Sequence, residues 1–232
     1  MAVELVLRVL VFEVGGNGVT VDEALRGALL PRLIGDYGAL DAYVGRRAEA
    51  ALDERVVASV ARAGAPAASL EPGGLFAEPD GSLGEPDGSL AGSLRLGRDE
   101  RLSVRVSIPP GPGERPRVLR LFRGETRAGG IDEYVGAAFA GATSDAATNP
   151  GLVSLYLGVG TGDRFVTMSA WTDWSAIEAA TGGDVHRPFW TRHIDRLVGF
   201  DVRHYELLPD APRPSGPLPP PLGPETPEGP AT

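Results

Sequence analysis

Residues 151–171 read GLVSLYLGVGTGDRFVTMSAW, and this stretch decides the fold. Two runs rich in β-branched and aromatic residues, 152–157 and 164–171, flank a glycine-rich connection at residues 158–163. Because glycine permits the positive φ that a tight reversal requires, the pattern predicts a β-hairpin.

An earlier stretch, residues 40–60, has the same outline. Residues 43–45 (YVG) correspond to residues 156–158 (YLG), and an apolar run follows at a similar spacing in both stretches. Internal repetition of this kind indicates a chain built from two similar units.

The remaining patterns complete each unit as strand–helix–strand–strand–helix–strand, the ferredoxin-like arrangement. Further strands are predicted at residues 4–14, 101–108, 117–125 and 200–207, and helical segments near residues 20–31, 66–70, 131–148, 173–180 and 188–197. Pro31 is expected to kink or end the first helix, because proline lacks the N–H that a helix interior needs.

The predicted boundaries give a first unit at residues 1–108, a proline-rich linker at 109–116 and a second unit at 117–208. A tandem duplication, EPDGSLG followed by EPDGSLA, is built from turn-forming residues and predicts an exposed, mobile loop at residues 72–92. Residues 209–232 are rich in proline and poor in large apolar residues, so we expect a disordered or polyproline-like tail.

Composition excludes several classes of function. The net charge is −9, and no basic run supplies the counterion displacement that nucleic-acid binding needs. The chain contains no lysine and no cysteine, which excludes Schiff-base chemistry, a phosphate-loop lysine and thiolate ligands. No apolar run reaches the roughly 20 residues of a membrane helix, and the N-terminus lacks a basic leader, so a cytoplasmic protein is expected.

Two glycine-rich runs resemble nucleotide-binding loops only superficially. A strand follows residues 158–162, whereas a dinucleotide fingerprint opens a helix. Residues 15–18 lie between a predicted strand and helix but lack the phosphate-loop spacing. Both are interpreted as turns.

Short motifs in the second unit resemble the antibiotic biosynthesis monooxygenase family. They are residues 118–124 (VLRLFRG), 149–152 (NPGL), 169–171 (SAW) and 203–207 (RHYEL). The resemblance implies a dimeric α/β barrel, in which two ferredoxin-like units pair their antiparallel sheets. With both units in one chain, it implies an α+β fold with an intramolecular pseudo-dimer. The family includes cofactor-independent oxygenases of aromatic polyketides, haem-degrading enzymes and members without known activity.

The second unit also holds most of the chemically useful side chains. All three histidines, all three tryptophans and 11 of the 15 aromatic residues lie there. His193 is the candidate catalytic base, because it follows Phe189 and Trp190 at spacings that can share one helix face. The candidate substrate-binding residues are Tyr156, Trp171, Trp174 and Trp190. The alternative for each is an ordinary core or surface position.

No cofactor is predicted. Haem-degrading members of the family use an asparagine on the first strand, whereas Arg120, Phe122 and Arg123 stand there in this chain. Haem with His193 as axial ligand remains a weaker alternative. His186 and His193 are seven residues apart, which on one helix means roughly 10 Å, so no metal site is predicted from them. His204 is interpreted as one member of a structural His-Tyr pair.

Together these observations predict a protein that binds a small hydrophobic or aromatic ligand, as a cofactor-independent monooxygenase of an aromatic or polyketide-like compound. An alternative from a different class is a non-catalytic scaffold, whose tail at residues 209–232 docks a partner protein. Neither alternative involves nucleic acid or a membrane.

Overall fold

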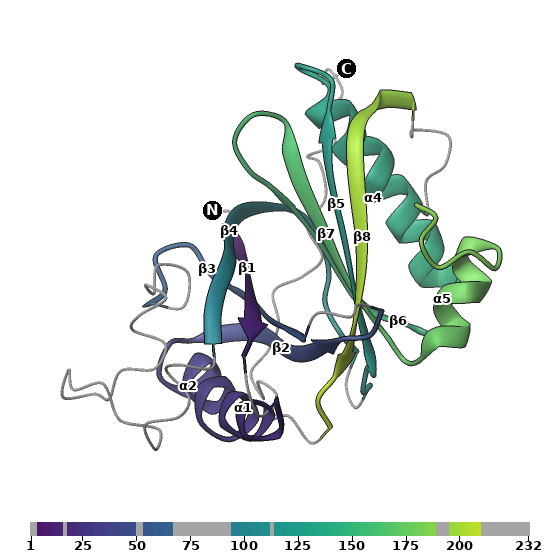
Figure 1. Ribbon diagram of the computed structural model, residues 1–232. Helices are drawn as coiled ribbons and strands as arrows, with labels where there is room; N and C mark the ends of the chain where they lie inside the picture. The colour runs from purple at the N-terminus through teal and green to yellow at the C-terminus, as the bar shows by residue number, and fades with distance from the viewer. Residues whose placement is uncertain are drawn as a thin grey trace.

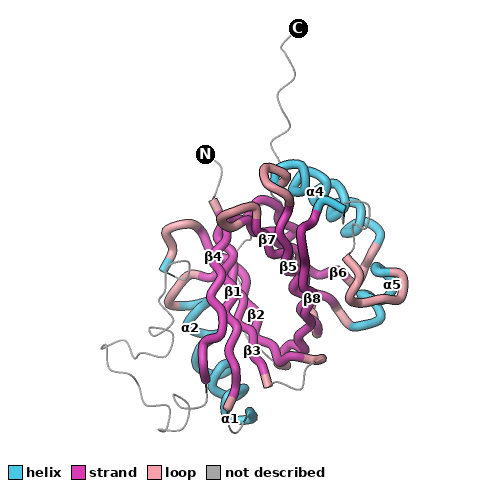
Figure 2. The backbone as a smooth tube through the Cα atoms, turned by 45° about the horizontal axis from the view of Figure 1, so that its top comes forward, coloured by secondary structure: helices cyan, strands magenta, loops and turns pink. Residues whose placement is uncertain are grey.

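The computed structural model of the chain describes residues 4–15, 18–49, 53–66, 94–111, 114–188 and 195–209. Within these residues, eight strands form a closed barrel in the order β1-β3-β2-β8-β5-β7-β6-β4. The helices lie outside the ring of strands, as Figures 1 and 2 show. The molecule is therefore an α+β protein with an antiparallel sheet.

Both predicted hairpins are confirmed. In the first, β2 (Ala39–Arg47) pairs antiparallel with β3 (Glu54–Arg62). In the second, β6 (Leu152–Val159) pairs antiparallel with β7 (Arg164–Trp171). Gly162 and Asp163 reverse the chain between β6 and β7 with φ values of 69° and 60°. The glycine-rich connection is thus a turn, as predicted.

The remaining elements follow the predicted order with some shifted bounds. They are β1 (Leu5–Val14), β4 (Leu94–Ile108), β5 (Val118–Thr126), α4 (Ile131–Thr148), α5 (Trp174–Thr181) and β8 (Leu197–Leu207). The strand β4 begins earlier than the alternating run at residues 101–108 indicated, because residues 94–98 extend its pairing with β1. Leu197 begins β8 and does not end a helix.

Pro31, which was predicted to kink or end the first helix, follows an interruption of the regular α-helix. The helical path runs from α1 (Gly18–Ala24) through a π-helical turn, η1 (Leu25–Leu29), into α2 (Leu30–Gly35). The π-helical turn η1 ends at Leu29, so Pro31 is the second residue of α2 and lies in its first turn. Proline is tolerated at that position, because the N–H it lacks is not needed there.

Side chains alternate between the inside of the barrel and the two helix-covered outer faces. On β5, Leu119 and Leu121 belong to the interior core, while Val118 and Phe122 pack beneath α4 and α5. On β1, Leu10 and Phe12 pack beneath the helical path of the first half. Because successive strand residues point to opposite faces, positions one or three residues apart lie in different layers.

Several predicted features lie outside the described residues. They are the EPDGSL duplication within the loop at residues 72–92, most of the predicted helices at 66–70 and 188–197, and the tail from residue 210 onward. Among the helices that the structure describes, none is both long and apolar enough to cross a membrane.

Candidate functional site

A buried polar group occupies the interior of the barrel. The hydroxyl of Tyr43 donates to Asp41 Oδ2 at 2.8 Å, and that of Tyr156 donates to the same oxygen at 3.0 Å. The Tyr43 hydroxyl also lies 2.8 Å from Ser154 Oγ. Burial, followed by the nearby Asp41 and Tyr43, raises the pKa of Tyr156 far above its usual range, so this phenol stays protonated.

A cleft of about 940 Å³ adjoins this polar group where β2 meets β8. These strands pair through residues 45–47 and 205–207, so Tyr43 and Val44 lie beyond the paired region and both line the cleft, Tyr43 with its side chain in the interior core and Val44 with its side chain in the outer layer. Its lining includes Tyr43, Val44, Val118 and Trp174, together with the charged residues Arg115, Arg117 and Asp173. The lining, which also includes Glu206, thus combines apolar surface with charges of both signs, and a small molecule with both kinds of surface could bind there.

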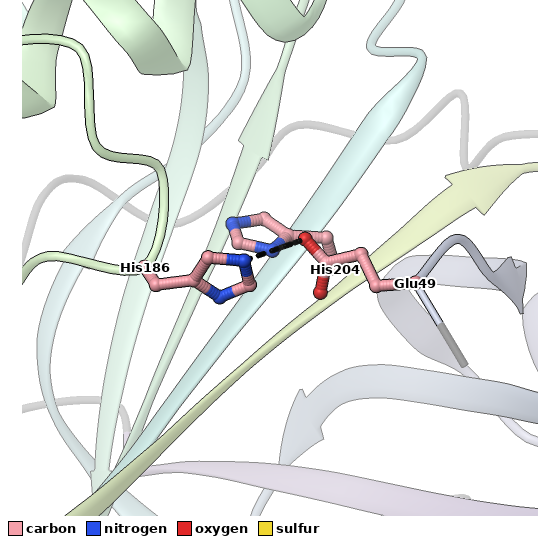
Figure 3. A group of neighbouring side chains, drawn as sticks. All are labelled: Glu49, His186 and His204. Carbon is pink, nitrogen blue, oxygen red and sulfur yellow. Dashed lines mark ion pairs between the residues drawn. The ribbon is translucent and has the colours of Figure 1, made fainter.

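A second cluster lies on the outer face of the same seam. Glu49 follows β2, His204 lies on β8, and His186 lies in the loop after α5 (Figure 3). Glu49 Oε1 is 2.6 Å from His204 Nδ1 and 3.5 Å from His186 Nε2. Side-chain exposure is 0% for His204, 21% for Glu49 and 59% for His186, so the cluster runs from a buried position outside the barrel to the surface.

Hydrogen bonds to backbone carbonyl groups hold the chain segments that carry these three residues. Arg120, buried on β5 directly opposite His204, donates from Nη2 to the carbonyl oxygen of Arg187 at 2.8 Å. A longer bond of 3.4 Å joins Arg120 Nε to the carbonyl oxygen of Val185, so both neighbours of His186 are tied to the sheet. The amide of Ala48 donates to the carbonyl of His204 at 3.1 Å, which places Glu49 beside the imidazole.

The protonation of the cluster follows from burial. Desolvation, followed by the positive charge of Arg120, lowers the pKa of His204 to about 3. Desolvation also raises the pKa of Glu49 from its usual range, against the opposing effects of His186 and Arg47. His204 is therefore neutral near pH 7, and its short contact with Glu49 is a close polar contact and not an ion pair. Among the described residues, neither of its ring nitrogens has an aligned hydrogen-bond partner.

The structure separates some of the predicted site residues. Tyr156 points into the barrel, whereas Trp171 lies in the layer beneath α4 and α5 and donates to Ser169 Oγ at 2.9 Å. Trp174 lines the cleft, and its ring lies 5.1 Å from that of His204. Trp190 and His193 lie outside the described residues, so their predicted roles stay predictions.

Asp41, Tyr43 and Glu49 were not among the residues predicted from the sequence. Asp41 had a local signal, since it is an acidic residue within the apolar strand β2. Tyr43 had a second signal, because it corresponds to Tyr156 in the repeated outline and meets Tyr156 at Asp41. Glu49 had none, because it meets His204 only through the pairing of β2 with β8.

The two histidines that the structure describes have surroundings that matter for metal binding and for haem binding. From the sequence, no metal site was predicted, because the argument used only the spacing between His186 and His193. The fold brings two other residues, His204 and Glu49, to His186.

As an axial haem ligand, His204 does not fit. Its side chain is fully buried between Trp174, Glu49 and His186, which leaves no open face for a macrocycle.

Comparison with known proteins bears on the fold. No protein-family model matches the chain, and no curated protein matches its sequence. A solved structure from Fusobacterium nucleatum, provisionally named a monooxygenase, superposes with a TM-score of 0.68 at 11% identity, covering 96% of this chain and 99% of its own. Another from Lactobacillus acidophilus, with the same provisional name, gives 0.64 at 13% identity, covering 88% and 94%.

A heme-binding protein from Thermus thermophilus also has this fold, with a TM-score of 0.53 at 11% identity, covering 90% of this chain and 92% of its own. At these identities the likeness shows the fold alone. The chain therefore has a monooxygenase-like α+β fold, which is found both in proteins named monooxygenases and in one that binds haem.

Proposed function

We propose that this protein binds a small aromatic or polyketide-like molecule in the cleft between β2 and β8, and oxygenates it without a bound cofactor. The observation that carries the proposal is the buried group of Tyr43, Asp41 and Tyr156 beside that cleft. The monooxygenase names of proteins with the same fold support the reaction class.

The cleft suits a flat, weakly acidic substrate. Trp174 and Val44 offer apolar surface for an aromatic ring, and the nearby Arg117 offers a positive charge for a phenolate or carboxylate on its edge. The aromatic ring and the arginines of this lining support the proposed substrate class.

Oxygenation without a cofactor requires a base that removes a proton from carbon. Tyr43 lines the cleft, and its buried hydroxyl donates to Asp41, so in this proposal a substrate that reaches the hydroxyl gives its proton to Tyr43 as Tyr43 passes its own proton to the carboxylate. Tyr156 donates to the same carboxylate and holds it in place. Asp41 is thus the final proton acceptor.

The remaining steps need only dioxygen. The substrate carbanion transfers one electron to O₂, and recombination of the two radicals forms a C–O bond in a peroxide, which is protonated to the hydroperoxide. Cleavage of its O–O bond, with loss of the second hydrogen from the same carbon, releases water and leaves a carbonyl. The balance is CH₂ + O₂ → C=O + H₂O, with the substrate carbon as the reductant.

The test is oxygen consumption by the full chain with a panel of anthrone-type and phenolic compounds. We expect Asp41→Asn and Tyr43→Phe to lower kcat by about 10² or more, since a positioned acid–base group contributes about 10²–10⁴. Trp174→Ala is expected to raise KM, and Tyr37→Phe, on the outside of the barrel, is the matched control. Absence of both turnover and binding across the panel contradicts the proposal, as does a fully active Asp41→Asn.

We also infer that the barrel is an intramolecular pair of two units related to the antibiotic biosynthesis monooxygenases. The strand order β4-β1-β3-β2 in the first half matches β8-β5-β7-β6 in the second half, which supports this architecture. The two hairpins occupy corresponding places in the two halves.

A further inference from the structure

We propose that Glu49, His186 and His204 bind one divalent transition-metal ion. One ligand atom from each residue lies within 4.8 Å of the other two, and Figure 3 shows the three side chains converging. The site is separate from Asp41 and Tyr43, so the proposal does not depend on the oxygenase function.

The strongest indication is the state of His204. Its side chain is fully buried, and although the backbone of Val185 lies close enough to affect the pKa of His204, neither ring nitrogen has a well-aligned hydrogen-bond partner among the described residues. Buried polar atoms are nearly always satisfied, and an unsatisfied one signals a missing ligand, ion or water. Glu49 Oε1 lies 2.6 Å from Nδ1 of His204 and 3.5 Å from Nε2 of His186, so a ligand atom from each residue lies close to this unsatisfied nitrogen.

The distances suit a metal after a small adjustment. Ligand bonds of about 2.0–2.2 Å in a tetrahedral site place the ligand atoms roughly 3.3–3.6 Å apart. Glu49 Oε1 and His186 Nε2 are already 3.5 Å apart, and Glu49 Oε1 must move away from His204 Nδ1, now at 2.6 Å. Glu49 and His186 are partly exposed, so their side chains can make that movement.

The sheet holds the ligand-bearing segments ready for a metal. Arg120 bonds to the carbonyl groups on either side of His186, and Ala48 bonds to the backbone of His204. A metal therefore orders only side chains, and the site gains affinity from this preorganisation.

The donor set and its surroundings select the class of metal. Two imidazoles and one carboxylate, with solvent-facing positions left for water, suit Zn²⁺, Fe²⁺ or Co²⁺. Arg47 and Arg120 place positive charge near Glu49, which opposes every cation, so the selectivity comes from the donor set: Mg²⁺ and Ca²⁺ require mainly oxygen ligands, and the site offers one carboxylate. We therefore expect binding of imidazole-preferring ions and not of Mg²⁺.

The experiment is a Co²⁺ titration of the untagged full chain after treatment with a chelator, followed by visible absorption. We expect one Co²⁺ per chain, displacement by Zn²⁺, and no displacement by millimolar Mg²⁺. His186→Ala and Glu49→Gln should each weaken binding at least tenfold, and both positions are exposed enough to leave folding intact. Matched controls are Arg187→Ala on the same loop and Glu178→Gln on α5, which should bind as the parent protein does.

Thermal unfolding without metal verifies that each variant is folded. Failure to form a one-to-one Co²⁺ complex overturns the proposal. Unchanged affinity in both His186→Ala and Glu49→Gln also overturns it, as does loss of binding in His193→Ala alone, which would assign the metal to a different histidine. None of these outcomes changes the expected oxygen consumption of the Asp41 variants.

Discussion

Gly158, on β6, shows how one missing side chain permits the barrel to close. A Cβ placed on this glycine would lie 2.7 Å from Leu102 Cβ on β4 and 3.3 Å from a methyl group of Leu7 on β1. The sequence pattern GVGTG suggests only a turn at this point. The structure adds that the first glycine permits the close approach of β6 and β4.

We expect Gly158→Ala to destabilise the protein by about 1–3 kcal/mol, because an added methyl group overpacks a filled core. Urea unfolding measures this change. Gly136→Ala on α4 is the control, since its methyl group meets no described atom within 4 Å and alanine favours a helix by up to about 1 kcal/mol. Equal stability of Gly158→Ala and the parent protein would contradict the overpacking argument.

The raised pKa of Tyr205 predicts how the free energy of unfolding changes at alkaline pH. Burial, followed by its hydrogen bond to Glu54 at 2.5 Å, raises the pKa of Tyr205 to about 12. Above about pH 10, the unfolded chain releases this proton while the native chain keeps it, so the free energy of unfolding falls as pH rises. Tyr205→Phe should flatten that decline between about pH 10 and 12, as measured by urea unfolding. An equally steep decline of the free energy of unfolding in Tyr205→Phe and in the parent protein would contradict this prediction.

At the scale of elements, the loop after α5 depends on a side chain from the barrel. Asp173 caps the start of α5 by accepting from the amide of Ala176 at 2.9 Å, and Gly182 ends the helix with φ of 72°. Beyond that point the chain is tied to β5 through Arg120. Local caps therefore define the helix, and a long-range bond positions the loop with His186.

Replacing Arg120 should loosen this loop without unfolding the barrel. In Arg120→Met, the carbonyl groups of Val185 and Arg187 lose their buried donor, and a lost hydrogen bond to a charged group is worth about 1.5–3 kcal/mol. We expect amide hydrogen exchange in residues 182–188 to become at least about tenfold faster. Arg105→Met, at an exposed position on β4, is the control. Unchanged exchange in both variants would show that other contacts hold the loop.

At the scale of the molecule, two strand pairings, or seams, join β1–β4 to β5–β8, the two halves of the barrel in chain order. Residues 45–47 of β2 pair with residues 205–207 of β8, and residues 103–108 of β4 pair with residues 155–159 of β6. The shorter seam borders the cleft, and the longer seam contains Gly158. The cleft thus lies where strand pairing between the halves is shortest.

A chain cut between the halves tests whether the seams suffice to hold them together. We expect a protein with a protease site inserted at residues 112–113 to remain one particle after cleavage, because both seams and the interior core join the halves. Size-exclusion chromatography under native conditions, and gel electrophoresis under denaturing conditions, measure this. Separation of the fragments under native conditions would refute it.

The sequence alone determined the local elements. Both hairpins, α4 and α5 were predictable because strand alternation, helix caps and turn glycines act between residues close in the chain. The predicted pocket was less accessible to this reasoning. Tyr156 and Trp171 lie near each other in sequence, but their side chains occupy different layers of the structure.

Only the tertiary structure decided which side chains meet across the barrel. Asp41 and Tyr156 are 115 residues apart, and their contact depends on how the two hairpins face each other across the interior. Glu49, His186 and His204 likewise come from separate elements, joined by the short β2–β8 seam and by Arg120. Such contacts depend on the register between distant strands, because a shift of one residue would turn the strand side chains Asp41, Tyr156 and His204 to the opposite face.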